Sequence, residues 1–144
     1  MSATVFVLNG PNLNLLGSRE PEIYGRDTLD DIARMMSDRA RALDLQLDIR
    51  QSNHEGHLID WLHEAAASGA KAVILNAGGY THTSIALRDA IAAIAVPVIE
   101  VHLSDPARRE AFRRTNFLSE VCKQSITGLG AQGYIHALDA AAAL

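Results

Sequence analysis

Short apolar runs alternate with longer stretches of helical periodicity, and this alternation restricts the possible folds more than any other feature of the chain. Five runs are predicted to be strands: residues 5–8, 45–50, 72–75, 98–101 and, more weakly, 125–127. Five stretches are predicted to be helices: residues 28–43, 54–69 and 85–94, a short one opening at 105–106, and an alanine-rich one ending at 144. Strands and helices in this alternation form a parallel sheet with helices on both faces.

The predicted fold is a flavodoxin-like α/β three-layer sandwich, with a five-stranded parallel sheet in the order 2-1-3-4-5. A chain of 144 residues can bury roughly 70% of the surface that it exposes when unfolded, and we expect one domain over residues 1–144. Helix starts are indicated at Asp27 or Thr28 and at Thr83 or Ser84, because these side chains suit the N-cap position.

Composition limits the kinds of partner that this chain is expected to bind. The net charge of −4 argues against nucleic acid, which selects basic surfaces, and one cysteine cannot form a disulfide framework. No apolar run reaches the length of a membrane span, and the N-terminus has no signal-peptide pattern, so we expect a cytoplasmic protein. Small molecules and copies of the same chain are the expected partners.

A long segment without clear periodicity follows the first strand, reading LNGPNLNLLGSREPEIYG over residues 8–25. Connections in compact domains usually have about 4 to 6 residues, so this length indicates a binding loop or lid. Its polar residues, which would be useless in a core, include Asn9, Asn12, Asn14, Arg19, Glu20 and Tyr24. Flanking glycines would permit hinge motion, and we expect a mobile lid at about residues 18–26.

The carboxyl ends of the first, third and fourth strands supply polar groups at residues 9–14, 76–82 and 100–104, which one pocket could hold. Lys71, Lys123 and Cys122 precede strands and lie at the opposite edge, which argues against imine and thiol catalysis. No phosphate-binding GKS/T triplet is present. Acid–base chemistry by histidine, tyrosine and carboxylate remains, with asparagine and arginine as orienting groups.

Four motifs, LNGPNLNLLGSREPEIYG, QSNHEG, ILNAGGYTHTSIALRDA and PVIEVHLSDPARREAFR, together resemble the type II 3-dehydroquinate dehydratases, from Val5 to about Leu138. The resemblance implies a flavodoxin-like catalytic domain that converts 3-dehydroquinate to 3-dehydroshikimate through an enolate. It implies no cofactor and no metal, a role in the shikimate pathway or in quinate catabolism, and a homododecamer of four trimers.

By the same resemblance, Tyr24 is the base as tyrosinate, and Arg19 on the same lid stabilises its negative charge. Asn12 holds the water or hydrogen bond that meets the enolate oxygen. His102 is the acid for the leaving hydroxyl, with Glu100 as its partner. The spacing supports this last pair, because residues two apart on a strand share one face.

Substrate binding is implied for six further residues: Asn76, His82, Asp89, Leu103, Ser104 and Arg113. Leu103 and Ser104 would hold the substrate carboxylate, and Asp89 would act across the trimer interface. The chain departs from the family pattern at Cys122, Lys123 and Gln124, where the family commonly has Ala-x-Gly. This position is remote from the expected pocket, so the departure concerns local packing or subunit contacts more than catalysis.

Other interpretations of these residues remain open. Asn12 beside Pro11 is also typical of a turn. Glu100 and His102 could form a buried ion pair, or ligate a metal in a hydrolase. The main alternative function is a flavodoxin-like module that binds a small anion or a flavin without turnover.

Overall fold

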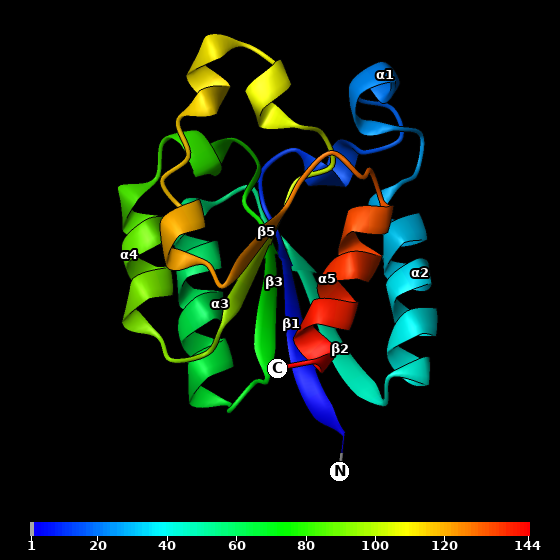
Figure 1. Ribbon diagram of the computed structural model, residues 1–144, viewed down its shortest axis with the longest axis vertical. Coiled ribbons are helices and arrows are strands. Elements are labelled where there is room, and N and C mark those ends of the chain that lie inside the picture. Colours follow the sequence, from blue (N-terminus) through cyan, green and yellow to red (C-terminus); the bar gives the residue numbers. More distant parts are fainter. Residues whose placement is uncertain (1) are drawn as a thin grey trace.

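The computed structural model describes residues 2–144 and shows a parallel sheet between two layers of helices (Figure 1). Its strands are β1 (Ala3–Asn9), β2 (Leu45–Gln51), β3 (Ala72–Asn76), β4 (Val98–Val101) and β5 (Gln124–Ile126). Their order is β2-β1-β3-β4-β5, and every neighbouring pair is parallel. The predicted flavodoxin-like sandwich is therefore confirmed.

Four long helices cover the sheet, two on each face. They are α2 (Leu29–Ala42), α3 (Glu55–Ala67), α4 (Ile85–Ala93) and α5 (Gln132–Ala142). Figure 1 shows α2 and α5 on one side of the strands and α3 and α4 on the other. Among residues 2–144, no helix is long and apolar enough to cross a membrane.

Alternate residues of the central strands enter two separate cores. Val5 and Val7 of β1 pack in the cluster beneath α2 and α5, whereas Phe6 and Leu8 pack in the cluster beneath α3 and α4. Because successive strand side chains point to opposite faces, a central strand covered on both sides is apolar throughout. This explains why the buried strands read as continuous apolar runs.

Two of the predicted N-caps are confirmed. The Thr28 hydroxyl accepts a hydrogen bond from the Asp31 backbone N–H, and the Asp31 carboxylate accepts one from the Thr28 N–H, forming a capping box. The Ser84 hydroxyl accepts from the Leu87 N–H at the start of α4. These bonds fix where the helices begin after the loops of the carboxyl edge.

The connection from β4 to β5 differs from the expected short helix. It consists of three separate 3₁₀ turns at Pro106–Arg108, Ala111–Arg114 and Ser119–Val121. Asp105 does cap the first turn, accepting from the Ala107 N–H. Extended backbone at Arg109 and Glu110 then stops propagation. The first two turns rise above the sheet (Figure 1), where they can cover a site, whereas the third lies beside α4 and packs on that face of the sheet through Leu118 and Val121.

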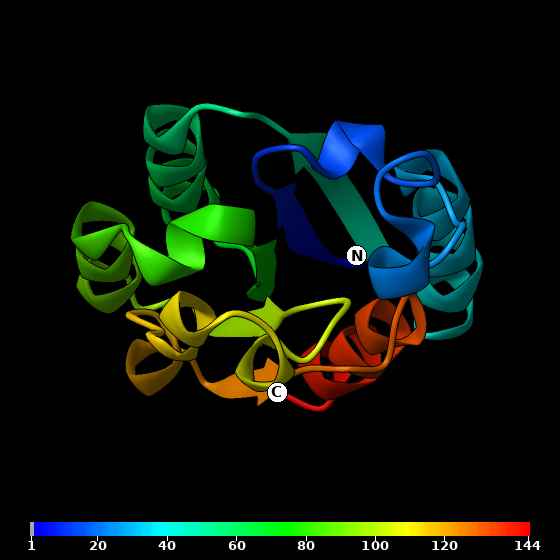
Figure 2. The same ribbon diagram turned by 90° about the horizontal axis from the view of Figure 1, so that it is seen from above.

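The long loop after β1 also contains short helical pieces that its sequence did not indicate. A 3₁₀ turn spans Leu13–Leu15, and the four-residue helix α1 spans Pro21–Tyr24. Asn9, expected to be a loop residue, is the last residue of β1 and is fully buried. Figure 2 looks down onto this edge and shows α1 and the 3₁₀ turns arranged around the strand ends.

Strand register aligns the ends that build the site. Asn9 pairs with Gln51 of β2 and with Asn76 of β3. Glu100 of β4 pairs with Leu75 of β3 and with Ser125 of β5. The polar residues at the strand ends therefore lie at nearly one level, as the topology of an open parallel sheet predicts.

Candidate active site

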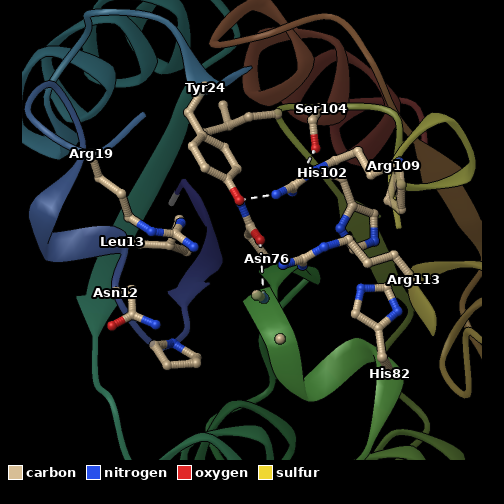
Figure 3. Close-up of a pocket in the computed structure, with 15 residues that line it drawn as sticks. Asn12, Leu13, Arg19, Tyr24, Asn76, His82, His102, Ser104, Arg109 and Arg113 are labelled. Carbon is tan, nitrogen blue, oxygen red and sulfur yellow. Dashed lines mark hydrogen bonds between the residues drawn. The ribbon is translucent and has the colours of Figure 1, made fainter. Parts of the chain in front are cut away.

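A cavity of about 180 Å³ opens at the carboxyl edge of the sheet (Figure 3). Every predicted site residue except Glu100 and Asp89 lines it. Those lining residues are Asn12, Arg19, Tyr24, Asn76, His82, His102, Leu103, Ser104 and Arg113. The structure therefore brings together side chains that are up to about a hundred residues apart in the chain.

Tyr24 lies between two arginines at the top of the cavity. The Arg109 Nη1 donates a hydrogen bond of 2.7 Å to the Tyr24 hydroxyl oxygen, and the Arg19 guanidinium lies 4.5 Å from the ring centroid. A guanidinium has donors only, so the tyrosine oxygen is the acceptor in this contact. Both arginines therefore place positive charge beside Tyr24.

Arg109 is the functional candidate that sequence reasoning missed. It lies in the run ARREAFRR, where nothing in the spacing separates it from Arg108. In the structure the Arg109 side chain is 12% exposed and the Arg108 side chain 87%. Only the three-dimensional path of the 3₁₀ segment shows which of the two neighbours turns inward.

The Glu100 carboxylate is fully buried beneath His102 and accepts three hydrogen bonds. The His102 Nε2 donates at 2.6 Å, Ser125 Oγ at 2.6 Å and Asn116 Nδ2 at 2.8 Å. Burial alone acts to raise the pKa of this carboxyl, but these donors and the charge of His102 outweigh it and hold the pKa below its usual value. An ionised Glu100 then fixes the orientation of the His102 ring.

The predicted alternatives for this pair can be compared with its surroundings. Residues 2–144 contain no group of three or more His, Cys, Asp or Glu side chains positioned to hold a metal ion. Glu100 and His102 instead bond to each other, and only His102 reaches the cavity. The geometry is that of an imidazole oriented by a carboxylate.

Asn12 adopts the left-handed conformation, with φ of 69°, at the rim of the cavity. Its backbone N–H donates to the Asn53 side-chain oxygen at 3.0 Å, which holds the turn in place. The preceding Gly10 lies so close to β3 that a Cβ there would be 2.6 Å from the Ala77 carbonyl oxygen. The loops after β1 and β3 are thus packed backbone to backbone beneath the cavity.

His82 and the 103–104 segment present polar groups to the cavity. The His82 Nδ1 lies 2.6 Å from the Thr115 carbonyl oxygen and donates to it, because a carbonyl can only accept. The other ring nitrogen, Nε2, is not used in this bond. The backbone amides of Leu103 and Ser104 donate to no acceptor within residues 2–144. Two free amides and the Ser104 hydroxyl are suited to an anion.

The charge of the lining is one-sided. Arg19, Arg109 and Arg113 line the cavity, and none of its fifteen lining residues is Asp or Glu. The chain as a whole carries a net charge of −4, so this concentration of cations is local. Figure 3 shows Arg19 on one side of Tyr24 and Arg109 on the other. Such a pocket favours a small anion.

The predicted site residue Asp89 lies outside the cavity, and so does Cys122, which the sequence places at the opposite edge of the sheet. Asp89 is on α4, exposed, and contacts Arg88 at 3.3 Å. Cys122 is half-buried against the core beneath α3 and α4, where burial raises the pKa of its thiol to about 12. The chemistry of the cavity therefore includes no thiolate from Cys122.

The fold and the cavity together define a flavodoxin-like α/β protein with a cationic pocket at the carboxyl ends of its strands. The family described as dehydroquinase class II matches residues 3–142, and the chain belongs to that family. A 3-dehydroquinate dehydratase from Hyphomonas neptunium is 59% identical over 141 residues, which is 98% of this chain and 94% of that protein.

Solved structures agree with this assignment. The type II dehydroquinase from Butyrivibrio crossotus superposes with a TM-score of 0.95 at 40% identity, covering 97% of both chains. The type II dehydroquinase from Propionibacterium acnes gives a TM-score of 0.95 at 41% identity, covering 100% of this chain and 99% of that one.

Proposed function

We propose that this protein is a 3-dehydroquinate dehydratase, which removes water from 3-dehydroquinate to give 3-dehydroshikimate in the shikimate pathway. The observation that carries the proposal is the cationic cavity in which Tyr24, held by Arg109 and Arg19, accompanies the Glu100–His102 pair. Elimination from a β-hydroxy ketone needs a base and an acid, together with a stabilised enolate between the two steps.

In the first step, Tyr24 as tyrosinate removes the proton beside the ketone, and the C–H electron pair moves to form an enolate. The two guanidinium groups stabilise the ionised Tyr24 before the transfer. Asn12, at the cavity rim, supplies the hydrogen bond or bound water for the enolate oxygen.

In the second step, the enolate collapses, the C–O bond to the departing hydroxyl breaks, and His102 donates the proton that completes the water molecule. Ionised Glu100 stabilises the protonated ring before this transfer and fixes its direction. Tyr24 then returns its proton to solvent and His102 takes one up, so the free enzyme is restored.

The substrate is held by groups of matching charge. The free amides of Leu103 and Ser104, with the Ser104 hydroxyl, receive the carboxylate. Asn76, His82 and Arg113, which also line the cavity, contact the ring hydroxyls. The lid at residues 18–26, which carries Arg19 and Tyr24, closes over the bound substrate. We further predict that the protein acts in the cytoplasm.

The proposal is tested by absorbance. Purified protein, treated with EDTA, is mixed with 3-dehydroquinate, and the ultraviolet band of the conjugated enone is followed. A borohydride-treated sample runs in parallel, because reduction would trap an imine. Rapid growth of the band in both samples is expected. Folded protein that gives no band would overturn the dehydratase assignment in favour of a binding module.

We further propose that twelve chains assemble as four trimers, and that Asp89 contributes to the cavity of a neighbouring chain. The exposure of Asp89 and its position outside its own chain's cavity support this role. Light scattering should then give about twelve times the 15.5 kDa chain mass.

Asp89→Asn should lower kcat/KM by roughly tenfold or more, the range for a lost charged hydrogen bond, without changing the assembly. Asp60→Asn, at an exposed position on α3, is the matched control and should keep wild-type turnover. Equal kcat/KM values in the two variants would remove Asp89 from the site.

A further inference from the structure

A chain of buried hydrogen bonds runs from the edge of the sheet to the floor of the cavity through three side chains. The Asn9 Nδ2 donates to the Arg50 carbonyl of β2 at 3.1 Å. The Tyr134 hydroxyl on α5 donates to the Asn9 Oδ1 at 2.7 Å, and the Asn76 Nδ2 donates to the Tyr134 oxygen at 3.0 Å. Asn9 and Tyr134 are 0% exposed and Asn76 is 4% exposed.

The direction of every bond in this chain is fixed from both ends. The Arg50 carbonyl can only accept, so Asn9 must turn its amide nitrogen toward it and its oxygen toward Tyr134. The single hydroxyl hydrogen of Tyr134 is then used on Asn9, and its oxygen can only accept from Asn76.

At the other end the Gly78 backbone N–H, which can only donate, contacts the Asn76 Oδ1 at 3.2 Å. Both ends therefore require the same orientation of the Asn76 amide, which lines the cavity. One Nδ2 hydrogen remains free on Asn76, in a defined position.

The Tyr134 hydroxyl is suited to hold the Asn76 amide in one orientation, because it keeps its hydrogen. Burial raises its pKa well above the usual tyrosine range, more strongly than the Asn76 hydrogen bond lowers it, so the hydroxyl keeps its hydrogen at neutral pH. An ionised oxygen could not donate to Asn9, and the bond directions would no longer be defined. Tyr134 does not line the cavity, so it can act on a ligand only through Asn76.

We propose that Tyr134 is a positioning residue that sets the amide polarity of Asn76, so that Asn76 presents an N–H donor, not a carbonyl, to a substrate oxygen. This inference rests on the proposed dehydratase function. It makes the site selective for an acceptor at that position of the substrate. The selectivity is set by a hydroxyl on a helix that contributes no atom to the cavity.

The test is a double-mutant cycle on the full-length protein. Tyr134→Phe keeps the ring but removes the hydroxyl, and should lower kcat/KM about tenfold, mainly through KM, because the contact is made in both ground and transition states. Asn9→Ala removes no cavity atom and should change kcat/KM in the same direction. In an Asn76→Ala background, both substitutions should leave kcat/KM unchanged, because the amide that they orient is absent.

Leu138→Val is the matched control for packing, since Leu138 is fully buried one turn further along α5. It should lower the melting temperature without changing KM. The proposal would be overturned if Tyr134→Phe and Asn9→Ala lowered kcat/KM in the Asn76→Ala background by the same factors as in the wild type. It would also be overturned if Leu138→Val lowered kcat/KM as much as Tyr134→Phe does. If the wild-type protein forms no enone, the dehydratase assignment fails first. If the wild-type protein forms enone and Tyr134→Phe has the same kcat/KM, the positioning role of Tyr134 is refuted and the dehydratase assignment stands.

Discussion

Tyr24→Phe should lower kcat by about 10²- to 10⁴-fold, the range for loss of a catalytic acid or base, while ligand affinity changes only a few fold. The substitution keeps the ring between Arg19 and Arg109 and removes only the oxygen that accepts from Arg109. Steady-state kinetics gives kcat, and calorimetric titration with the reaction product gives affinity. A variant with near-normal kcat would show that another group removes the proton.

The adjacent arginines offer a matched control for the same step. Arg109→Lys replaces the planar group that donates to Tyr24 and should reduce turnover, because lysine cannot reproduce the guanidinium geometry. Arg108→Lys makes the same chemical change on a side chain that is 87% exposed and should retain turnover. Equal losses in the two variants would contradict a specific role for the contact between Arg109 and Tyr24.

Glu100→Gln should reduce both turnover and stability. Both oxygens of the carboxylate accept hydrogen bonds, whereas glutamine would place an N–H₂ group against one of the donors from His102, Ser125 or Asn116. An unsatisfied buried donor costs roughly 1 to 3 kcal/mol. Loss of the ring orientation should lower kcat by about 10²-fold or more, as for a misplaced acid. Urea unfolding at neutral pH and enone kinetics measure the two effects.

The stability difference should also depend on pH. The pKa of Glu100 is lowered in the folded state, so its stabilisation is fully present above the unfolded carboxyl pKa, about 4.3. It is lost as the pH falls through the lower pKa of the folded protein, because the carboxylate is then protonated in both states. The gap between wild type and Glu100→Gln should therefore narrow below about pH 4.3. A gap that stays constant down to pH 2 would contradict the assignment of Glu100 as an ionised acceptor.

The order of the sheet could be predicted because it depends on local periodicity and on the geometry of parallel connections. Apolar runs such as residues 72–75 have few alternatives once helices separate them. The grouping of Asn76 and His102 followed from the same logic, since parallel strands end at one edge. These predictions needed no knowledge of side-chain packing.

The remaining parts of the site depend on packing that spacing does not encode. Arg109 turns inward because extended backbone interrupts the 3₁₀ turns beside it, and this break has no clear sequence signal. Tyr134 in an alanine-rich helix reads as an ordinary core residue until the partner of its hydroxyl is known. Asn9 was expected in a solvated loop, yet the core accommodates it because each of its polar atoms is satisfied.

The close contact between Gly10 and Ala77 has a consequence for ligand exchange. It joins the loops after β1 and β3 into a rigid floor, whereas the roof is formed by two separate segments that carry Tyr24 and Arg109. Opening of the proposed lid would break the Tyr24–Arg109 bond and leave the floor intact. We therefore expect separation of the roof segments to limit the rate at which product dissociates. Weakening the Tyr24–Arg109 hydrogen bond should raise the dissociation rate of the product more than it lowers its association rate.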